Sequence, residues 1–240
     1  MDRPFVAVRR LWRQLSVAVL DAVLPTVCSA CGESGSGLCR PCRMALEGRP
    51  QNGCPRCGES LLPGGRCQED HRALRHLTQL LFPFRFAGTG GSLVRRFKLD
   101  GDASAGRRLA RAMADEFRMR SVVVRPLIVS VPLHRARRRR RGFDQAAWLA
   151  SRVGERLGLR AASGVLVRRR ATRPQGDAQV RSRSENVRGA FAVRASERLA
   201  GRDVLLVDDV MTTGATARAC AGLLKAAGAR SVVLLVGCRS

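Results

Sequence analysis

The stretch DVLLVDDVMTTGAT, residues 203–216, decides the fold of this chain. The apolar residues 204–207 predict a strand of a buried parallel sheet, and two adjacent carboxylates, Asp208 and Asp209, are expected to cap it. A Thr-Thr-Gly loop follows, and a helix is expected from about 215 to 227. Strand, loop and helix in this order are typical of a doubly wound α/β sheet, in which ligands bind at the carboxyl ends of the strands.

The residue types in this stretch predict a ligand that carries both a phosphate and hydroxyl groups. Free amides at the start of the helix and the threonine hydroxyls together form a cradle for an anion. The two aspartates cannot bind an anion, so we expect them to face hydroxyl groups or a hydrated Mg²⁺. A sugar phosphate with a cis-diol satisfies both halves. A capped helix with solvated aspartates is disfavoured, because two carboxylates at the end of a buried strand are costly without partners.

The segments upstream of this stretch continue the alternation of strands and helices. Hydrophobic periodicity and turn residues predict the following elements: an extended segment at 80–86 closed by glycines at 88–91, a short helical turn at 93–97, a helix at 102–119 capped by Asp102, a strand at 127–131, a basic loop at 132–142, and a helix at 144–158.

The N-terminal third of the chain carries cysteine pairs with metal-ligand spacing. Seven of the nine cysteines lie between positions 28 and 67, most of them in C-x-x-C pairs. In a reducing compartment such pairs indicate metal rather than disulfides, and two of them supply a closed tetrahedral zinc site with a structural role. The first predicted zinc site consists of Cys28, Cys31, Cys39 and Cys42.

A second zinc site is predicted from Cys54, Cys57, Cys67 and His71. Three interpretations remain open for it. His71 completes the set, because C-x-x-x-H reaches a tetrahedral site; or the site has decayed and binds nothing; or the first and third C-x-x-C pairs combine in one longer ribbon. Redox chemistry is the competing use of a C-x-x-C pair, but no thioredoxin-like βαβ pattern surrounds any of them.

Length and hydropathy set the domain organisation. The 240 residues hold one α/β domain and a small appendage, so we expect a helix and zinc region at 1–72 and the α/β domain at 73–240. No apolar run approaches the ~18 residues that cross a bilayer. The Arg-rich segment 1–25 is interpreted as a helix of the mature protein, although its pattern also suits a mitochondrial transit peptide. A cytoplasmic location is expected.

The formal net charge of +25 favours polyanionic partners such as nucleic acid, phosphorylated ligands or an anionic membrane surface. Only Lys98 and Lys225 are lysines, so the arginine excess also fits a GC-rich genome without selection for a basic surface. The arginine run at 137–141 suits a polyphosphate or a DNA backbone, and it equally suits a solvated charged loop.

The chain resembles the ComF family of competence-associated proteins, whose C-terminal signature is the PRPP-binding motif of type I phosphoribosyltransferases. The matching stretches follow in order along nearly the whole chain: LDAVLP at 20–25, the C-x-x-C pairs, FKLDG at 97–101, VPL at 131–133, RGFDQA at 141–146, RGAF at 188–191, and DDVMTTGAT at 208–216. The resemblance implies a mostly parallel phosphoribosyltransferase sheet behind a double zinc ribbon, with PRPP and Mg²⁺ at the site.

The resemblance also implies a role for individual residues. Asp208 and Asp209 would bind the ribose hydroxyls of PRPP. The residues expected around its 5-phosphate are Thr212, Thr213, Gly214, Ala215 and Thr216. The residues expected to face pyrophosphate are His134 and Arg135, and Arg135 joins the two aspartates as a catalytic candidate. The stretch 169–188 resembles a flexible hood that excludes water from an oxocarbenium-like sugar, with functional positions at Gln175, Arg183 and Asn186.

Three functions follow from these observations. The first is a phosphoribosyltransferase linked to DNA uptake, which displaces pyrophosphate with an unknown nucleophile. The second is a non-catalytic protein that binds single-stranded DNA or assists recombination on the same fold. The third is a PRPP sensor without turnover. The sequence departs from the family at Asp144, where Asn is usual, and at His71, where a cysteine is usual. Thr212 replaces the general base of purine-salvage relatives, which disfavours a nucleobase activated from that position.

Overall fold

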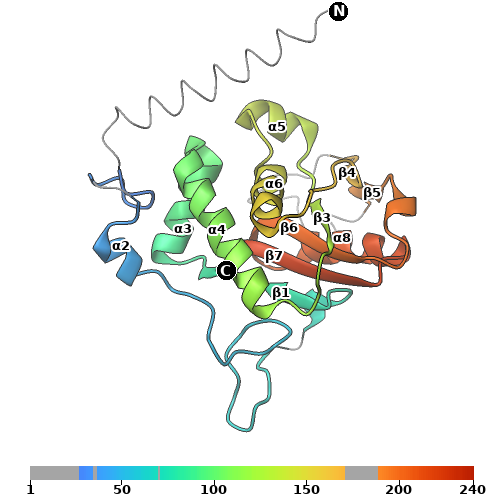
Figure 1. Cartoon of the computed structure of the whole chain (residues 1–240), viewed down its shortest axis with the longest axis horizontal. Coiled ribbons are helices and arrows are strands. Elements are labelled where there is room, and N and C mark those ends of the chain that lie inside the picture. The colour runs from blue at the N-terminus through green and yellow to red at the C-terminus, as the bar shows by residue number, and fades with distance from the viewer. Residues whose placement is uncertain (1–26, 35–36, 70, 171–188) are drawn as a thin grey trace, which may run out of the picture.

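The computed structural model describes residues 27–34, 37–69, 71–170 and 189–240 (Figure 1). Its centre is a sheet of five parallel strands. Four of them lie side by side in the order β1 (Gln79–Leu81), β7 (Ser231–Arg239), β6 (Asp203–Met211) and β3 (Leu127–Ser130), and β2 (Phe84–Arg85) pairs with the end of β7. The predicted mostly parallel α/β sheet is therefore confirmed.

Helices cover both faces of this sheet, as the doubly wound pattern predicts (Figure 1). The helices are α2 (Arg40–Met44), α3 (Gly88–Arg95), α4 (Ala103–Arg120), α5 (Arg135–Arg141), α6 (Gln145–Leu157) and α8 (Ala215–Ala226), with short helical turns η1 (Arg72–Leu74), η2 (Arg96–Asp100) and η3 (Ser196–Arg198). A separate antiparallel pair consists of β4 (Leu166–Arg168) and β5 (Phe191–Val193).

The core lies in two layers because side chains of a strand alternate between the faces of the sheet. Leu206 of β6 belongs to the buried cluster that contains Leu224 of α8. Leu205 belongs to the cluster on the other face, with Leu109 of α4 and Leu149 of α6. A strand buried on both faces needs apolar residues at every position, which explains the unbroken apolar run from which β6 was predicted.

The two long helices of one face begin and end within one residue of the predicted bounds. Asp102 accepts hydrogen bonds from the N–H groups of Ser104 and Ala105 at the start of α4. Asp144 accepts one from Ala147 at the start of α6, and Gly158 ends this helix with φ at 67°. Side-chain caps satisfy amides that have no partner within the helix, and a left-handed residue at the end favours glycine.

Three local predictions were wrong. The expected capped strand at 204–207 is longer, because β6 continues through both aspartates to Met211 in register with β7. The expected loop at 132–142 contains helix α5, since arginine is a good helix former and Gly142 ends it with φ at 80°. The glycines at 88–91 do not close a strand but form the first turn of α3.

The last strand, β7, was not singled out from the sequence, although its apolar run at 232–236 carries the signal of a buried strand. Within the described ranges, none of the helices combines the length and the apolar composition that crossing a membrane requires. The segments 1–25 and 171–188, for which a helix and a hood were predicted, lie outside the described residues, and the domain boundary at residue 72 stays a prediction.

Candidate functional site

The site candidates from two sequence stretches meet at the carboxyl edge of the sheet. β3 and β6 are neighbours, and Ser130 is in register with Val207. The N–H of Val131 donates to the carbonyl of Val207 at 2.9 Å, so the segment that follows β3 begins beside Asp208. The predicted ribose-binding and pyrophosphate-binding stretches therefore start from adjacent points of the sheet, which is where α/β sheets bind ligands.

Asp208 and Asp209, called the acid pair below, lie on β6, and backbone amides hold their carboxylates in place. The N–H of Asp209 donates to Oδ1 of Asp208 at 2.9 Å, and the N–H of Val210 donates to Oδ1 of Asp209 at 2.9 Å. Burial raises the pKa of Asp208 well above its usual range, and the neighbouring Asp209 raises it further. A bound cation or a hydroxyl donor at this pair would relieve the cost of ionising both groups.

Lys98 is a member of this site that the sequence analysis did not assign. Its Nζ lies 2.9 Å from Oδ2 of Asp209, and its side chain keeps about a third of its surface exposed, at 30%. The residue belongs to η2, and Gly101 ends this turn in the left-handed region. Its neighbour Phe97 packs against Phe143 and anchors η2 to the body of the domain. The sequence signal that could have pointed to Lys98 is that lysine is rare in this arginine-rich chain.

The loop after β6 has the geometry of an anion cradle. Thr212 and Thr213 are exposed, Gly214 and Ala215 are buried, and Thr216 is half-buried. Gly214 precedes α8 with φ at 70°, and it supplies no side chain to cap the amides of the first turn. Amides at a helix N-terminus attract anions because the helix dipole is positive there. The five predicted phosphate-binding residues thus lie in one turn, directly after the acid pair.

The predicted pyrophosphate-binding residues His134 and Arg135 lie at the start of α5. Nδ1 of His134 accepts a hydrogen bond from the N–H of Ala136, and Arg135 is exposed. Oδ2 of Asp144 accepts from the N–H of Leu133 at 3.3 Å, so the residue that caps α6 also fixes this segment. Both carboxylate oxygens of Asp144 thus accept a backbone hydrogen bond, whereas the Asn that is usual in the family has only one side-chain oxygen. The predicted hood residues Gln175, Arg183 and Asn186 lie outside the described residues.

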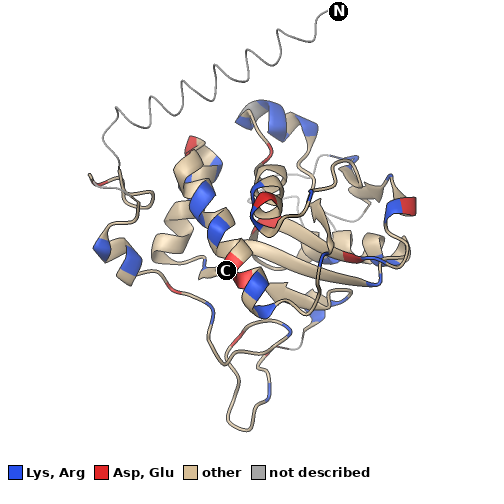
Figure 2. Ribbon diagram, in the orientation of Figure 1, with Lys and Arg blue, Asp and Glu red and all other residues tan. Residues whose placement is uncertain are grey.

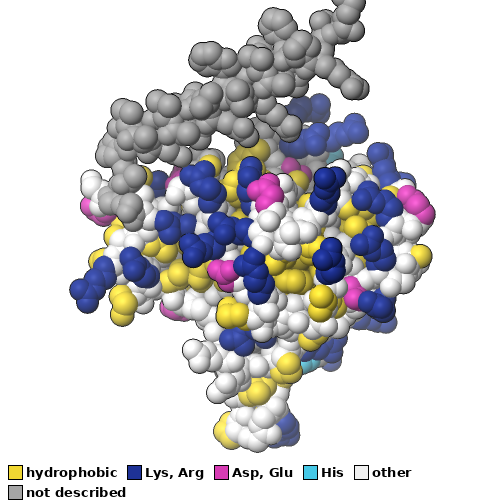
Figure 3. Space-filling model, viewed as in Figure 1, with side chains coloured by type: hydrophobic (Ala, Val, Ile, Leu, Met, Phe, Trp, Pro, Cys, Tyr) yellow, Lys and Arg dark blue, Asp and Glu magenta, His cyan; other side chains and the backbone are white. Residues whose placement is uncertain are grey.

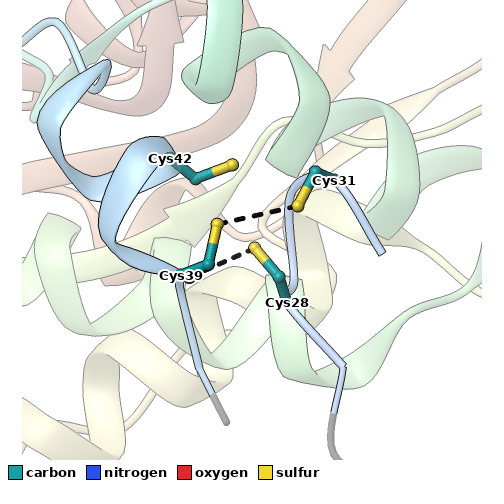
Figure 4. Close-up of side chains that lie close together, drawn as sticks. All are labelled: Cys28, Cys31, Cys39 and Cys42. Carbon is teal, nitrogen blue, oxygen red and sulfur yellow. Dashed lines mark hydrogen bonds between the residues drawn. The ribbon is translucent and has the colours of Figure 1, made fainter. Parts of the chain in front are cut away.

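The first predicted metal site is assembled around α2. Figure 4 shows its four cysteine side chains turned toward one another, and their sulfur atoms all lie within 4.8 Å of one another. The sulfur atoms of Cys31 and Cys39 are 3.7 Å apart. Zinc bound tetrahedrally to thiolates separates them by roughly 3.8 Å, so the set fits this ion.

The second predicted site brings Cys54, Cys57, Cys67 and His71 together within the same distance limit. Sγ of Cys54 lies 3.6 Å from Nε2 of His71, and Sγ of Cys57 lies 3.4 Å from Sγ of Cys67. The structure therefore separates two four-ligand sets, and the alternative that combined the first and third C-x-x-C pairs is wrong. His71 occupies the fourth ligand position where the family usually has a cysteine.

The electrostatics of both sets suit a bound cation. Burial raises the pKa of Cys42 to about 12 and that of Cys57 to about 12, with neighbouring thiols adding to the effect. Burial also opposes ionisation of Cys28, but backbone N–H groups outweigh it and lower the pKa to about 6. The four thiolates of the first set, or the three of the second, cannot coexist in such a small volume without a positive ion. Zinc binding would release these protons and contribute to folding.

Basic side chains are spread over the described surface, and helix α5 carries a dense group of them. In Figure 2 this helix is coloured almost entirely as Lys and Arg, and Arg135, Arg138 and Arg139 are exposed. Figure 3 shows further basic side chains spread over the face formed by α4 and α6, with apolar groups between them. Because α5 directly follows the β3 edge, its charge adds to the positive potential near the acid pair.

Comparison with known proteins matches both parts of the chain. The sequence model of the phosphoribosyl transferase domain matches residues 103–239, and that of the double zinc ribbon domain matches residues 19–70. The DNA utilization protein YhgH of Salmonella typhi is 32% identical over 212 residues, which cover 85% of this chain and 91% of that protein. Competence protein F of Haemophilus influenzae is 27% identical over 203 residues, with 82% and 88% covered. Competence protein ComFC of Streptococcus pneumoniae is 27% identical over 211 residues, with 82% and 85% covered.

Proposed function

Because this chain belongs to the ComF family, in which a double zinc ribbon precedes a phosphoribosyl transferase domain, we propose that it binds PRPP with Mg²⁺. The acid pair of Asp208 and Asp209, placed directly before the loop 212–214 and the amino end of α8, carries this proposal. The names of the competence and DNA utilization relatives support a role in DNA uptake or use.

The arrangement supports a division of the ligand among three groups of residues. The carboxylates of Asp208 and Asp209 accept hydrogen bonds from the 2- and 3-hydroxyls of the ribose. The amides at the start of α8 and the hydroxyls of Thr212, Thr213 and Thr216 hold the 5-phosphate. The basic residues that follow β3 face the pyrophosphate, where Mg²⁺ would neutralise part of its charge.

The chemistry proposed for this site is displacement of pyrophosphate at C1 of the ribose. The bond between C1 and the pyrophosphate oxygen breaks, the oxygen keeps the electron pair, and a nucleophile forms the new bond. Arg135 and Lys98 stabilise the negative charge that develops on the leaving group, because cations held near that charge lower the energy of the transition state. The acid pair stabilises the positive charge on the ribose ring.

Thermal melting of the zinc-loaded protein tests ligand binding. PRPP and Mg²⁺ at ~100 times the Kd are expected to add ~2.7 kcal/mol, which raises the Tm by roughly 5 to 10 °C for a chain of this size. The variant Asp208→Ala/Asp209→Ala should lose this shift, so that its Tm is the same with and without PRPP and Mg²⁺. Absence of a shift in folded, zinc-loaded wild type would refute the proposal.

A second candidate function is the binding of single-stranded DNA without turnover, and helix α5 with its exposed arginines favours it. Phosphate-driven association weakens steeply between ~50 and ~200 mM salt, and the slope reports the number of phosphates neutralised. Replacing Arg138 and Arg139 with Gln should reduce that slope by ~1 to ~2 if α5 contacts the backbone. A slope unchanged by this variant excludes α5 as the DNA contact.

Measurement of pyrophosphate release separates an enzyme from a PRPP sensor. A sensor binds PRPP and shows the Tm shift but releases no pyrophosphate beyond spontaneous hydrolysis with any nucleophile offered. An enzyme releases pyrophosphate in a reaction that needs Asp208 and Asp209. The acceptor substrate is identified as the compound that accelerates this release.

A further inference from the structure

The second metal site is fastened to the sheet through the backbone of its C-P-R-C turn, residues 54–57. Every carbonyl of this turn accepts a hydrogen bond from a residue elsewhere in the chain. The donors are Arg49 Nη2 to Cys54 O at 3.0 Å, Gln79 Nε2 to Pro55 O at 3.1 Å, Leu80 N to Arg56 O at 2.7 Å, and Arg239 Nη1 to Cys57 O at 2.8 Å. The cysteines of this turn also belong to the core on the α8 face.

Arg239 joins both halves of the second ligand set. Its guanidinium lies 2.8 Å from Oε1 of Glu59, close after the C-P-R-C turn, and 3.2 Å from Oε1 of Glu69, which lies between Cys67 and His71. The residue is buried, with 8% of its surface exposed. One side chain therefore ties together the two segments that a zinc ion at this site would also tie together.

The backbone of Arg239 reaches the other functional site. Arg239 is the last residue of β7 and is in register with Met211, the last residue of β6. The N–H of Ser240 donates to the carbonyl of Met211 at 3.0 Å. Thr212 follows at once, so the loop 212–214 leaves the sheet at the point where Arg239 is held. The chain of contacts from the metal ligands to this loop is continuous.

The first metal site has a different connection to the α/β domain. Oγ of Ser29 lies 2.9 Å from Oγ of Ser104 and accepts a hydrogen bond from Nε of Arg108 at 3.1 Å, and both partners belong to α4. Cys28 packs in the apolar cluster on the α4 face of the sheet, which also contains Cys238 of β7. Cys28 thus meets the sheet by apolar packing, whereas the second site is joined to the last residue of β7 by a hydrogen bond and two ion pairs. The two sites differ in this polar connection, so the first serves as the comparison for the second.

We propose that the second zinc site positions the loop 212–214 through Arg239. Filling of this site and the binding of a phosphate ligand at the loop then reinforce each other, because coupling between two sites is reciprocal. The ligand part rests on the proposed function, whereas the positioning of the loop does not. Arg239 is in this account a positioning residue that touches neither the ligand nor the metal.

Hydrogen exchange of the full, zinc-loaded chain tests the proposal without any ligand. Three proteins are compared: wild type, Cys67→Ser in the second site, and Cys42→Ser in the first site. Peptides that cover residues 208–216 should exchange at least about tenfold faster in Cys67→Ser, which corresponds to ~1.4 kcal/mol of opening free energy. They should exchange at the wild-type rate in Cys42→Ser. The peptide of α6, residues 145–157, should be unchanged in both.

Arg239→Met, with zinc content measured by mass spectrometry, separates positioning from loss of the metal. This variant should keep the zinc of both sites and still show the faster exchange at 208–216, and Arg239→Lys should restore part of the protection. Equal acceleration in all peptides would reduce Arg239 to a general stabilising residue and overturn the proposal, as would wild-type exchange at 208–216 in Cys67→Ser. Titration with PRPP and Mg²⁺ then tests whether ligand binding depends on the second zinc site. If wild type fails to bind PRPP, the proposed function is refuted, but the exchange result for the loop 212–214 remains valid.

Discussion

The buried ion pair between Arg49 and Glu116 allows a quantitative test of how the zinc region is held against the α/β domain. Nη1 of Arg49 lies 3.1 Å from Oε1 of Glu116, and the two side chains are 4% and 6% exposed. Burial lowers the pKa of Arg49 and raises that of Glu116, so both charges need compensation. Arg49 receives it from Glu116, whereas Glu116 also pairs with Nε of Arg120 at 3.5 Å. Arg49 also donates to the carbonyls of Cys54 and Leu80.

Removal of Glu116 leaves the guanidinium of Arg49 buried and uncompensated, which costs about 3 to 5 kcal/mol. We therefore expect Glu116→Leu to lower the Tm by roughly 6 to 20 °C, at 2–4 °C per kcal/mol. Arg49→Met should lie toward the lower end of this range, because Glu116 keeps its ion pair with Arg120. The double variant should be no less stable than either single variant, because replacement of a whole buried pair by apolar side chains is often close to neutral. The lost bonds to the two carbonyls still cost about 1 kcal/mol each.

Urea unfolding of the four proteins of this double-mutant cycle gives the coupling energy, which should reach about 3 kcal/mol. The exposed pair of Arg118 and Asp115 on the same helix is a matched control, because its atoms are also 3.1 Å apart but its side chains are 52% and 48% exposed. Its coupling should stay below about 1 kcal/mol. Additive effects at Arg49 and Glu116, or equal coupling in both pairs, would refute the reasoning from burial.

Three further predictions concern single positions. Hydrogen bonds from Arg230 first, and from Ser231 after it, lower the pKa of Asp203 from 3.8 to about 2. The stability that ionised Asp203 contributes is therefore present above pH 3.8 and is lost as the pH falls toward 2. Asp203→Asn should cost about 1 kcal/mol of unfolding free energy at pH 7, measured in urea, and a difference from wild type that persists below pH 2 would contradict this. Lys98→Met should weaken PRPP binding about tenfold while Lys98→Arg restores little, since arginine does not replace a compact ammonium; unchanged affinity in titration would remove Lys98 from the site. Gly214→Val should cost about 1 to 2 kcal/mol in unfolding and abolish the ligand shift, whereas Gly214→Asn, which tolerates positive φ, should keep most of both; equal losses would point away from backbone strain.

The central part of the fold could be predicted from the sequence because its signals are local. The apolar run before Asp208, the caps Asp102 and Asp144, and the glycine after α6 each act within a few residues of their position. The same holds for the cysteine pairs, whose spacing determines which thiols share a turn. Helix α5 was missed because a run of arginines reads equally as a solvated loop, and its helical form depends on the caps at both ends.

The contacts that connect the sites could not be predicted, because they join residues that are far apart in the sequence. Arg239 donates to the carbonyl of Cys57, which lies 182 positions away, and Arg49 pairs with Glu116 at a separation of 67. With 44 basic residues in the chain, pattern alone cannot choose which arginine meets which carboxylate. Lys98 joined the site for the same reason only once the fold placed η2 beside the end of β6.

Calorimetric titration of the zinc-loaded protein with PRPP in the presence of Mg²⁺ tests the central claim most directly. We expect saturable binding to wild type, no measurable binding to Asp208→Asn/Asp209→Asn, and weaker binding of ribose 5-phosphate, which lacks the pyrophosphate. The Asn variants keep the shape of the acid pair and remove its charge, so a loss of binding reports the carboxylates themselves. Binding that is equal in wild type and variant, or absent from both, would contradict the assignment of this edge of the sheet as a PRPP site.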